Sequence, residues 1–174
     1  MDTTLQFTAL KVNHATAITD YVADFANAGE QEIHGYFAKP EWDHALTVKT
    51  LEAWSHGREL GDLVPSTTHF LVSDGKILGN YNFRHKLTDA LMVYGGHCGY
   101  SVRPSERRKG YATLMLAHAK KLAQQLGMNR ILLTCNPDNT GSSRTIERNG
   151  GILQDKTYNE KLDSYVARYW IPLS

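Results

Sequence analysis

Apolar residues recur at helical spacing in two segments of the first third of the chain. Asn13 is suited to cap the first helix and Gly29 to end it, and a second helix is predicted over residues 47–60. The apolar positions of the first segment are Ile18, Val22 and Phe25. Both helices follow a short strand-like run at residues 5–10, so the chain is predicted to begin with a strand and two helices.

The middle of the chain carries strand patterns. Two strand-like runs surround Asp74 and Gly75, a dipeptide typical of a tight hairpin turn. A short helical turn is expected at residues 87–93, and a glycine-rich strand at 95–104, where glycine indicates a bulge or a close backbone approach. These elements predict an antiparallel meander.

The second half predicts strands alternating with helices. A long helix is expected over residues 109–126, with Gly127 suited to end it. Its apolar stripe comprises Ala112, Met115, Ala119, Leu122 and Leu126. The continuous apolar run at 130–135 is typical of a strand buried on both faces. A short helix at 139–151 and a terminal strand at 167–173 complete a mixed α/β fold, expected as one domain over residues 1–174.

Composition and charge narrow the classes of function. The chain has 19 cationic and 18 anionic side chains among 174 residues, a balance that argues against a nucleic-acid partner. The start has no basic segment before an apolar run, and no window is apolar enough for a membrane span, so a cytoplasmic protein is expected. Cys98 and Cys135 lie in strand-like surroundings and are expected to be buried free thiols. No cysteine or histidine spacing suggests a metal site.

Positive charge gathers at one place, the stretch RPSERRKGYA before the long helix. The first N–H groups of a helix have no intrahelical partner, and the helix dipole adds positive charge there, which suits a phosphate. Arg107, Arg108 and Lys109 add cations, while Gly110 and Ala112 leave the backbone open to approach. Neither a Walker loop nor a Rossmann fingerprint is present. The alternatives are a solvated basic turn that caps a helix and a nucleic-acid patch.

The sequence VRPSERRKGYATLML resembles the central motif of the GCN5-related N-acetyltransferases, the GNAT family. The motif residues are Val102, Pro104, Arg107, Gly110 and Ala112. A second match follows at NTGSSRTIERNGG, after a buried strand. The resemblance covers roughly residues 67–153 and is greatest to bacterial predicted acetyltransferases with a GYSVRPSERRKGYA-type stretch.

The resemblance implies an α/β fold with a mixed, mostly antiparallel central sheet flanked by helices. Two central strands splay apart in this fold, and acetyl-coenzyme A binds in the resulting cleft. It places the pyrophosphate at the turn, the pantetheine arm along Ser101 and Val102, and the coenzyme against Asn139 and Ser142. The residues implied at the turn are Arg107, Arg108, Lys109, Gly110, Tyr111 and Ala112.

The reaction implied is direct attack of an amine on the thioester. It requires a proton acceptor or a water chain, a backbone N–H for the developing oxyanion, and in many relatives a tyrosine that protonates the thiolate. That tyrosine stands seven positions after the family's asparagine, and here the count from Asn139 reaches Ile146. Ser142 or Ser143 is left as a hydrogen-bond donor to the sulfur. The expected glycine-aromatic pair is Gly150-Gly151 instead.

Candidates for proton transfer lie on the two strands before the turn. His97 is expected near the acetyl group, and imidazole titrates near neutral pH. The alternative is a structural strand histidine, and His85 is a second candidate. Tyr100 and Tyr94 are suited to position the substrate or act through water, or else to pack.

The acceptor site is expected in the loop between the first two helices and near the late strands. Carboxylates beside aromatic rings suit a cationic amine, although a solvated acidic loop is the alternative. These residues are Glu30, Glu32, His34, Tyr36, Glu41, Trp42 and Asp43. The expected function is acetyl transfer to a primary amine of a small molecule or peptide. A non-catalytic coenzyme A sensor is the alternative, and a homodimer is consistent with the family.

Overall fold

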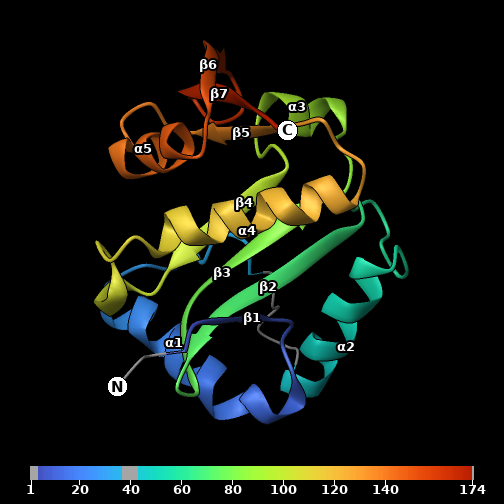
Figure 1. Ribbon diagram of the computed structural model, residues 1–174, viewed down its shortest axis with the longest axis vertical. Helices are drawn as coiled ribbons and strands as arrows, with labels where there is room; N and C mark the ends of the chain where they lie inside the picture. Colours follow the sequence, from blue (N-terminus) through green and yellow to red (C-terminus); the bar gives the residue numbers. More distant parts are fainter. Residues whose placement is uncertain (1–3, 37–42, 174) are drawn as a thin grey trace.

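The structure is a computed structural model that describes residues 4–36 and 43–173. Its strands form two sheets, one in the order β1-β2-β3-β4 and one in the order β5-β7-β6 (Figure 1). Every strand pair within both sheets is antiparallel. The elements are β1 (Gln6–Thr8), α1 (Ala15–Asn27), α2 (His44–Ser55), β2 (Ser66–Ser73), β3 (Lys76–Arg84), α3 (Asp89–Val93), β4 (Cys98–Val102), α4 (Tyr111–Gln125), β5 (Arg130–Cys135), α5 (Thr140–Arg148), β6 (Ile152–Asn159) and β7 (Ser164–Pro172).

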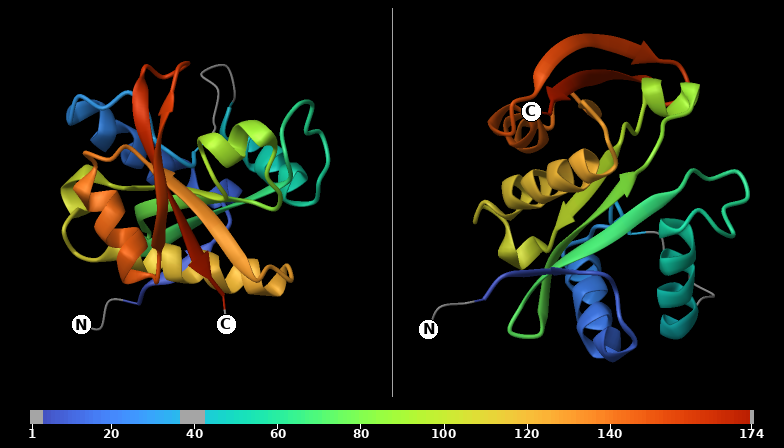
Figure 2. Two further views of the ribbon diagram at one scale, coloured as in Figure 1. Left: turned by 90° about the horizontal axis from the view of Figure 1, so that it is seen from above. Right: turned by 45° about the vertical axis from the view of Figure 1, so that its right-hand side comes forward.

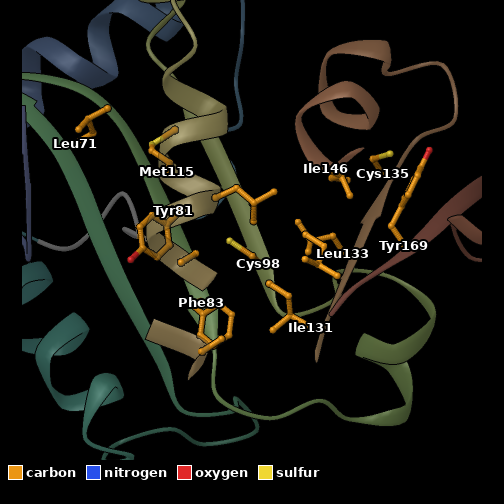
Figure 3. Close-up of a cluster of buried hydrophobic side chains, with 14 of the residues drawn as sticks. Leu71, Tyr81, Phe83, Cys98, Met115, Ile131, Leu133, Cys135, Ile146 and Tyr169 are labelled. Carbon is orange, nitrogen blue, oxygen red and sulfur yellow. The ribbon is translucent and has the colours of Figure 1, made fainter. Parts of the chain in front are cut away.

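Helices cover both faces of the first sheet (Figure 2). One core lies between this sheet and α1 and α2, and it includes Tyr21, Phe25 and Phe70. The other lies under α4 and continues into the second sheet, and Figure 3 shows part of it. Since β3 lies between the two cores, seven consecutive residues of it are buried, in contrast to the alternation of a half-exposed strand. The mixed α/β fold with a largely antiparallel sheet is therefore as predicted.

The two sheets meet at the start of β4 and β5. The His97 N–H donates to Leu132 O (2.7 Å), and the Leu132 N–H donates to His97 Nδ1 (2.9 Å). Gly96 has φ +58°, and a Cβ there would lie 2.5 Å from Leu132 O, so only glycine allows this approach. Beyond His97 the two strands share no ladder, so they diverge and open a cleft, as the splayed-strand prediction requires.

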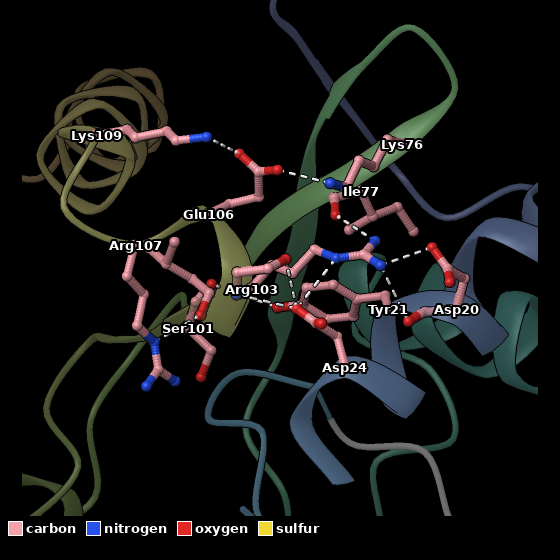
Figure 4. A network of polar contacts seen from close by, with 12 residues as sticks. Asp20, Tyr21, Asp24, Lys76, Ile77, Ser101, Arg103, Glu106, Arg107 and Lys109 are labelled. Carbon is pink, nitrogen blue, oxygen red and sulfur yellow. Dashed lines mark hydrogen bonds and ion pairs between the residues drawn. The ribbon is translucent and has the colours of Figure 1, made fainter. Parts of the chain in front are cut away.

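An ion-pair network joins the far end of β4 to α1 (Figure 4). The Arg103 Nη2 donates to Asp20 Oδ2 (2.6 Å), and its Nε lies 3.2 Å from Asp24 Oδ2. The Arg103 side chain is 7% exposed, whereas Asp20 is 63% exposed, so the two carboxylates compensate a positive charge that is largely buried. The Ser105 N–H and hydroxyl also donate to Asp24. These contacts fix the turn that leads from β4 into α4.

Several elements differ from the sequence prediction. The N-cap residue of α1 is His14 rather than the predicted Asn13, and α2 ends at Ser55 rather than at residue 60. Helix α2 begins at His44, three residues before the predicted start, because the Asp43 carboxylate caps it by accepting from the Leu46 N–H (2.7 Å). Strand β6 was not predicted, because its sequence ILQDKTYN has no apolar alternation. It forms an edge strand whose order comes from pairing with β7, and the sequence pattern does not contain that information.

We predict that His97 makes folding stability sensitive to acid. Burial lowers the pKa of His97 to about 4, below its ordinary value of 6.5, and the nearby positive charge of Arg84 acts in the same direction. Its stabilisation is therefore present above pH 6.5 and lost as the pH falls to 4, an effect of roughly 3 kcal/mol. In His97→Asn the amide oxygen replaces Nδ1 and does not titrate.

The measurement is the free energy of unfolding in urea at pH 7.5, 6, 5 and 4.5 for both proteins. The variant should be less stable at pH 7.5, because it loses the stacking of the ring on Phe83. Its stability should nevertheless decline less than that of the wild type as the pH falls. Parallel declines would show that His97 contributes nothing to the acid sensitivity.

Candidate functional site

A cavity of about 1390 Å³ occupies the cleft between the two sheets. Strands β4 and β5 form its walls, and the N-terminal ends of α4 and α5 form one end. The loop at residues 30–36 and the turn between β6 and β7 border the other parts. Every predicted coenzyme-binding residue except Lys109 lines this cavity, so the structure brings the two sequence motifs together.

The turn before α4 forms an anion cradle, defined here as the backbone N–H groups of residues 108–113. Arg108 and Gly110 have φ +68° and +84°, and this alternation turns successive N–H groups toward one side. The first helical bond is from Leu114 N–H to Gly110 O (3.1 Å), and the six N–H groups before it have no acceptor among the described residues. A Cβ on Gly110 would meet no atom within 4 Å, so the cradle opens to space.

Most cationic side chains of the turn are already paired with carboxylates. Arg107 binds Glu30 in two parallel bonds (2.6 and 2.7 Å), and Lys109 binds Glu106 (2.6 Å). The Arg107 bonds hold the pKa of Glu30 below its ordinary value. Arg108 has no ion pair with any described residue. The cradle therefore attracts an anion through its backbone and Arg108 more than through the whole basic cluster.

Two arginines that the sequence analysis missed line the same cavity. Arg144 and Arg148 lie four residues apart on α5, so they share one face of that helix. Neither makes an ion pair with the described residues. The sequence signal for them is their i, i+4 spacing after Asn139.

The register of β4 decides which backbone groups face the cleft. Arg84 N–H donates to His97 O, and Arg103 N–H donates to Leu78 O. Hydrogen-bonded pairs alternate along an antiparallel ladder, so Ser101 directs its N–H and C=O toward β3. Tyr100 and Val102 direct theirs toward the cleft. The backbone N–H and C=O groups that a pantetheine arm could bind therefore belong to Tyr100 and Val102 rather than to Ser101.

Tyr100 and Ser142 bridge the cleft from β4 to α5. The Tyr100 hydroxyl lies 2.9 Å from Ser142 Oγ, and both residues line the cavity. Burial raises the pKa of Tyr100, so the phenol keeps its proton at neutral pH. Asn139 caps α5, since its Oδ1 accepts from the Ser142 N–H (3.0 Å). The sequence analysis chose Tyr100 and Ser142 separately, and the structure joins them.

The position at which relatives carry a tyrosine holds a core residue here. Ile146 is 0% exposed and packs in the core beneath α4. Its side chain does not line the cavity. Ile146 therefore has no contact with the cleft, in addition to having no proton to donate.

The two candidate histidines lie outside the lining of the cavity. His97 is 8% exposed, its Nδ1 accepts from Leu132, and its ring stacks on Phe83. Its geometry matches the structural alternative rather than the predicted proton acceptor. His85 Nε2 lies 2.8 Å from Thr67 Oγ1, away from the cleft.

The loop expected to bind the acceptor borders the cavity in part. Glu30, Glu32, His34 and Tyr36 line it, and Glu30 is also paired with Arg107. Asp43 is the cap of α2 and does not line the cavity. The predicted acceptor residues Glu41 and Trp42 lie outside the described residues.

Arg84, Tyr94 and Tyr165 also line this part of the cavity.

No group of three or more potential metal-binding side chains occurs within residues 4–36 and 43–173. In the same residues, no helix is long and apolar enough to cross a membrane.

Solved structures of acetyltransferases share this fold. One, from Salmonella typhimurium, is described as modifying the N-terminal serine of 50S ribosomal subunit protein L7/L12; it is 16% identical, with a TM-score of 0.68 over 100% of this chain and 97% of that chain. The ribosomal-protein-S5-alanine acetyltransferase of Vibrio fischeri is 16% identical, with a TM-score of 0.66 over 98% and 93%. RimL in complex with coenzyme A is 17% identical, with a TM-score of 0.68 over 99% and 96%.

At identities this low, the likeness establishes the fold. No curated protein matches the chain at the level of sequence. The sequence profile of the acetyltransferase (GNAT) domain matches residues 10–152, which is most of the chain. The chain therefore belongs to the GNAT family of acetyl-coenzyme A-dependent acetyltransferases.

Proposed function

We propose that this protein transfers the acetyl group of acetyl-coenzyme A to a primary amine. The observation that carries the proposal is the anion cradle at residues 108–113, whose six N–H groups have no acceptor among the described residues and lie at one end of a large cavity. Such groups at a helix N-terminus suit a pyrophosphate. Arg108, Arg144 and Arg148 supply cations for the phosphates of the coenzyme.

The walls of the cleft suit the extended arm of the coenzyme. Tyr100 and Val102 present backbone groups along β4, and the Val102 carbonyl already accepts from Arg107 Nε (3.2 Å). The coenzyme supplies an acetyl thioester when bound. RimL binds coenzyme A in its solved complex, which supports the same ligand here.

Tyr100 and Ser142 are proposed as the donors to the leaving sulfur. Tyr100 holds its proton because burial raises its pKa, and Ser142 fixes the direction of its hydroxyl. A donor at this point stabilises charge that develops on the sulfur. We propose that water, rather than His97, takes the proton from the amine of the acceptor, because the Nδ1 of His97 already accepts from the Leu132 N–H.

The acceptor class follows from the family and from the relatives. One of them is described as modifying the N-terminal serine of ribosomal protein L7/L12, and another is a ribosomal-protein-S5-alanine acetyltransferase. A primary amine of a small molecule or of a peptide is therefore proposed for this enzyme.

We predict that Gly110→Asp abolishes coenzyme binding without unfolding the protein. Asparagine and aspartate both tolerate positive φ, so Gly110→Asn is the matched control without the charge. Acetyl-coenzyme A at about 100 times its dissociation constant should stabilise the wild type by about 2.7 kcal/mol. The measurement is the melting temperature of each protein with and without the coenzyme.

With the coenzyme, the melting temperature of the wild type should rise by several degrees. That of Gly110→Asn should rise by part of this amount, and that of Gly110→Asp should not rise. An equal gain in the Asp variant would place the coenzyme elsewhere. No gain in the wild type at millimolar coenzyme would refute the proposed function.

We predict that Tyr100→Phe and Ser142→Ala lower kcat by at least about 10-fold, because each removes part of the donor to the leaving sulfur. Ser143→Ala is the control, because Ser143 donates to Asn139 O and does not line the cavity. The measurement is coenzyme A release under saturating substrates, with coenzyme affinity determined in parallel. Unchanged kcat in Tyr100→Phe would remove this donor from the mechanism. Binding without turnover of any amine by the wild type would favour the sensor alternative.

A further inference from the structure

Arg84 presents an unused hydrogen-bonding edge to the cavity. Its Nη1 donates to the carbonyl oxygens of Gly95 (3.1 Å) and Gly96 (3.0 Å), which uses both hydrogens of that nitrogen. Nε and Nη2 have no acceptor among the described residues, and neither is sealed from solvent. The remaining N–H groups therefore form one side of a planar fork that is open to a ligand.

The charge of Arg84 is not neutralised within the described part of the chain. No carboxylate there lies within ion-pair distance of it. Burial lowers the pKa of its guanidinium, which shows that the charge is partly removed from water without a compensating anion. Such a group gains from an anionic ligand, because the desolvation cost is already met by the fold.

Arg84 is held at the closed end of the cleft, next to the contact that joins β4 to β5. The Gly95–Gly96 turn that it binds directly precedes His97, which joins β4 to β5. The Gly95 N–H donates to Thr134 Oγ1 (2.9 Å), so the turn is attached to β5 as well. A ligand on Arg84 would therefore lie at the closed end of the cleft, at the beginning of the strand that carries Tyr100.

We propose that Arg84 binds a carboxylate of the acceptor, so that the acceptors are amino acids with a carboxylate close to the reacting amine. This inference rests on the proposed acetyl transfer. The Nε and Nη2 edge of a guanidinium matches the two oxygens of a carboxylate, and such bidentate bonds are strong and directional. Arg84 is thus a specificity-determining residue of the acceptor site.

The test compares each of the twenty common amino acids with its α-carboxamide as an acceptor, with acetylated product measured by mass spectrometry. In the wild type, kcat/KM for the best acid should exceed that for its amide by about 10- to 100-fold. Arg84→Gln should reduce kcat/KM for the acid to the value for its amide, and kcat/KM for the amide should change by no more than a few-fold. Arg84→Lys should restore part of the preference, because it keeps the charge without the fork.

Arg168→Gln is the matched control. Arg168 also donates to a main-chain carbonyl before β4, that of Met92, but its other edge is paired with Asp155 and it does not line the cavity. Its loss should change stability without changing the preference for acids. If Arg84 only supports the Gly95–Gly96 turn, Arg84→Gln should slow acids and amides alike, and that result would overturn the inference.

Equal wild-type rates on acids and amides, or acetylation of none of the acids, would also overturn it. The proposed function is judged separately by the rise in melting temperature with acetyl-coenzyme A. Acetylation only of amines without a carboxylate would therefore refute the inference and leave the acetyltransferase assignment intact.

Discussion

The attachment of β4 to β5 at one end only is the constraint on which the rest of the structure depends. Gly96 and His97 bring the two strands together, and beyond them each strand pairs only within its own sheet. The cleft-facing backbone groups of Tyr100 and Val102 are left for a ligand as a consequence. A continuous sheet would have satisfied these groups internally and left no site. Arg103 fixes the other end of β4 against α1, so the opening of the cleft is held from both ends.

The charged side chains around the cradle hold the turn in place as much as they attract an anion. Exposed ion pairs such as Arg107–Glu30 add little to stability. This pair nevertheless connects the coenzyme turn to the loop at residues 30–36, which borders the acceptor part of the cavity. The proposed coenzyme and acceptor regions therefore share one structural contact. Since Lys109 is paired with Glu106 as well, the proposed phosphate site rests on the geometry of the backbone N–H groups more than on the sum of nearby cations.

Sequence patterns predicted the helices, most strands and the cradle, because these depend on local periodicity and on helix termini. They did not predict β6, whose order comes from its partner strand. They also assigned His97 by its distance along the chain from the turn, and distance along the chain does not show which side chains a neighbouring strand will engage. Ser101 illustrates the same limit, since the direction of its backbone groups depends on the register with β3. Arg84 had no signal in the sequence, because its free edge is defined by contacts with a turn eleven residues away.

The two departures from the family pattern at the end of α5 have one physical cause. Ile146 replaces the usual tyrosine and is fully buried, and Gly151 replaces the usual aromatic residue. A Cβ at Gly151 would collide with Ile146 Cγ2 and would lie 2.8 Å from its carbonyl oxygen, so the glycine is required by the close packing of this helix end. Because the Ile146 side chain packs in the core, position 146 has no access to the cleft. The donor proposed for the sulfur therefore belongs to another element: Tyr100 on β4 contacts the same helix one turn earlier, at Ser142.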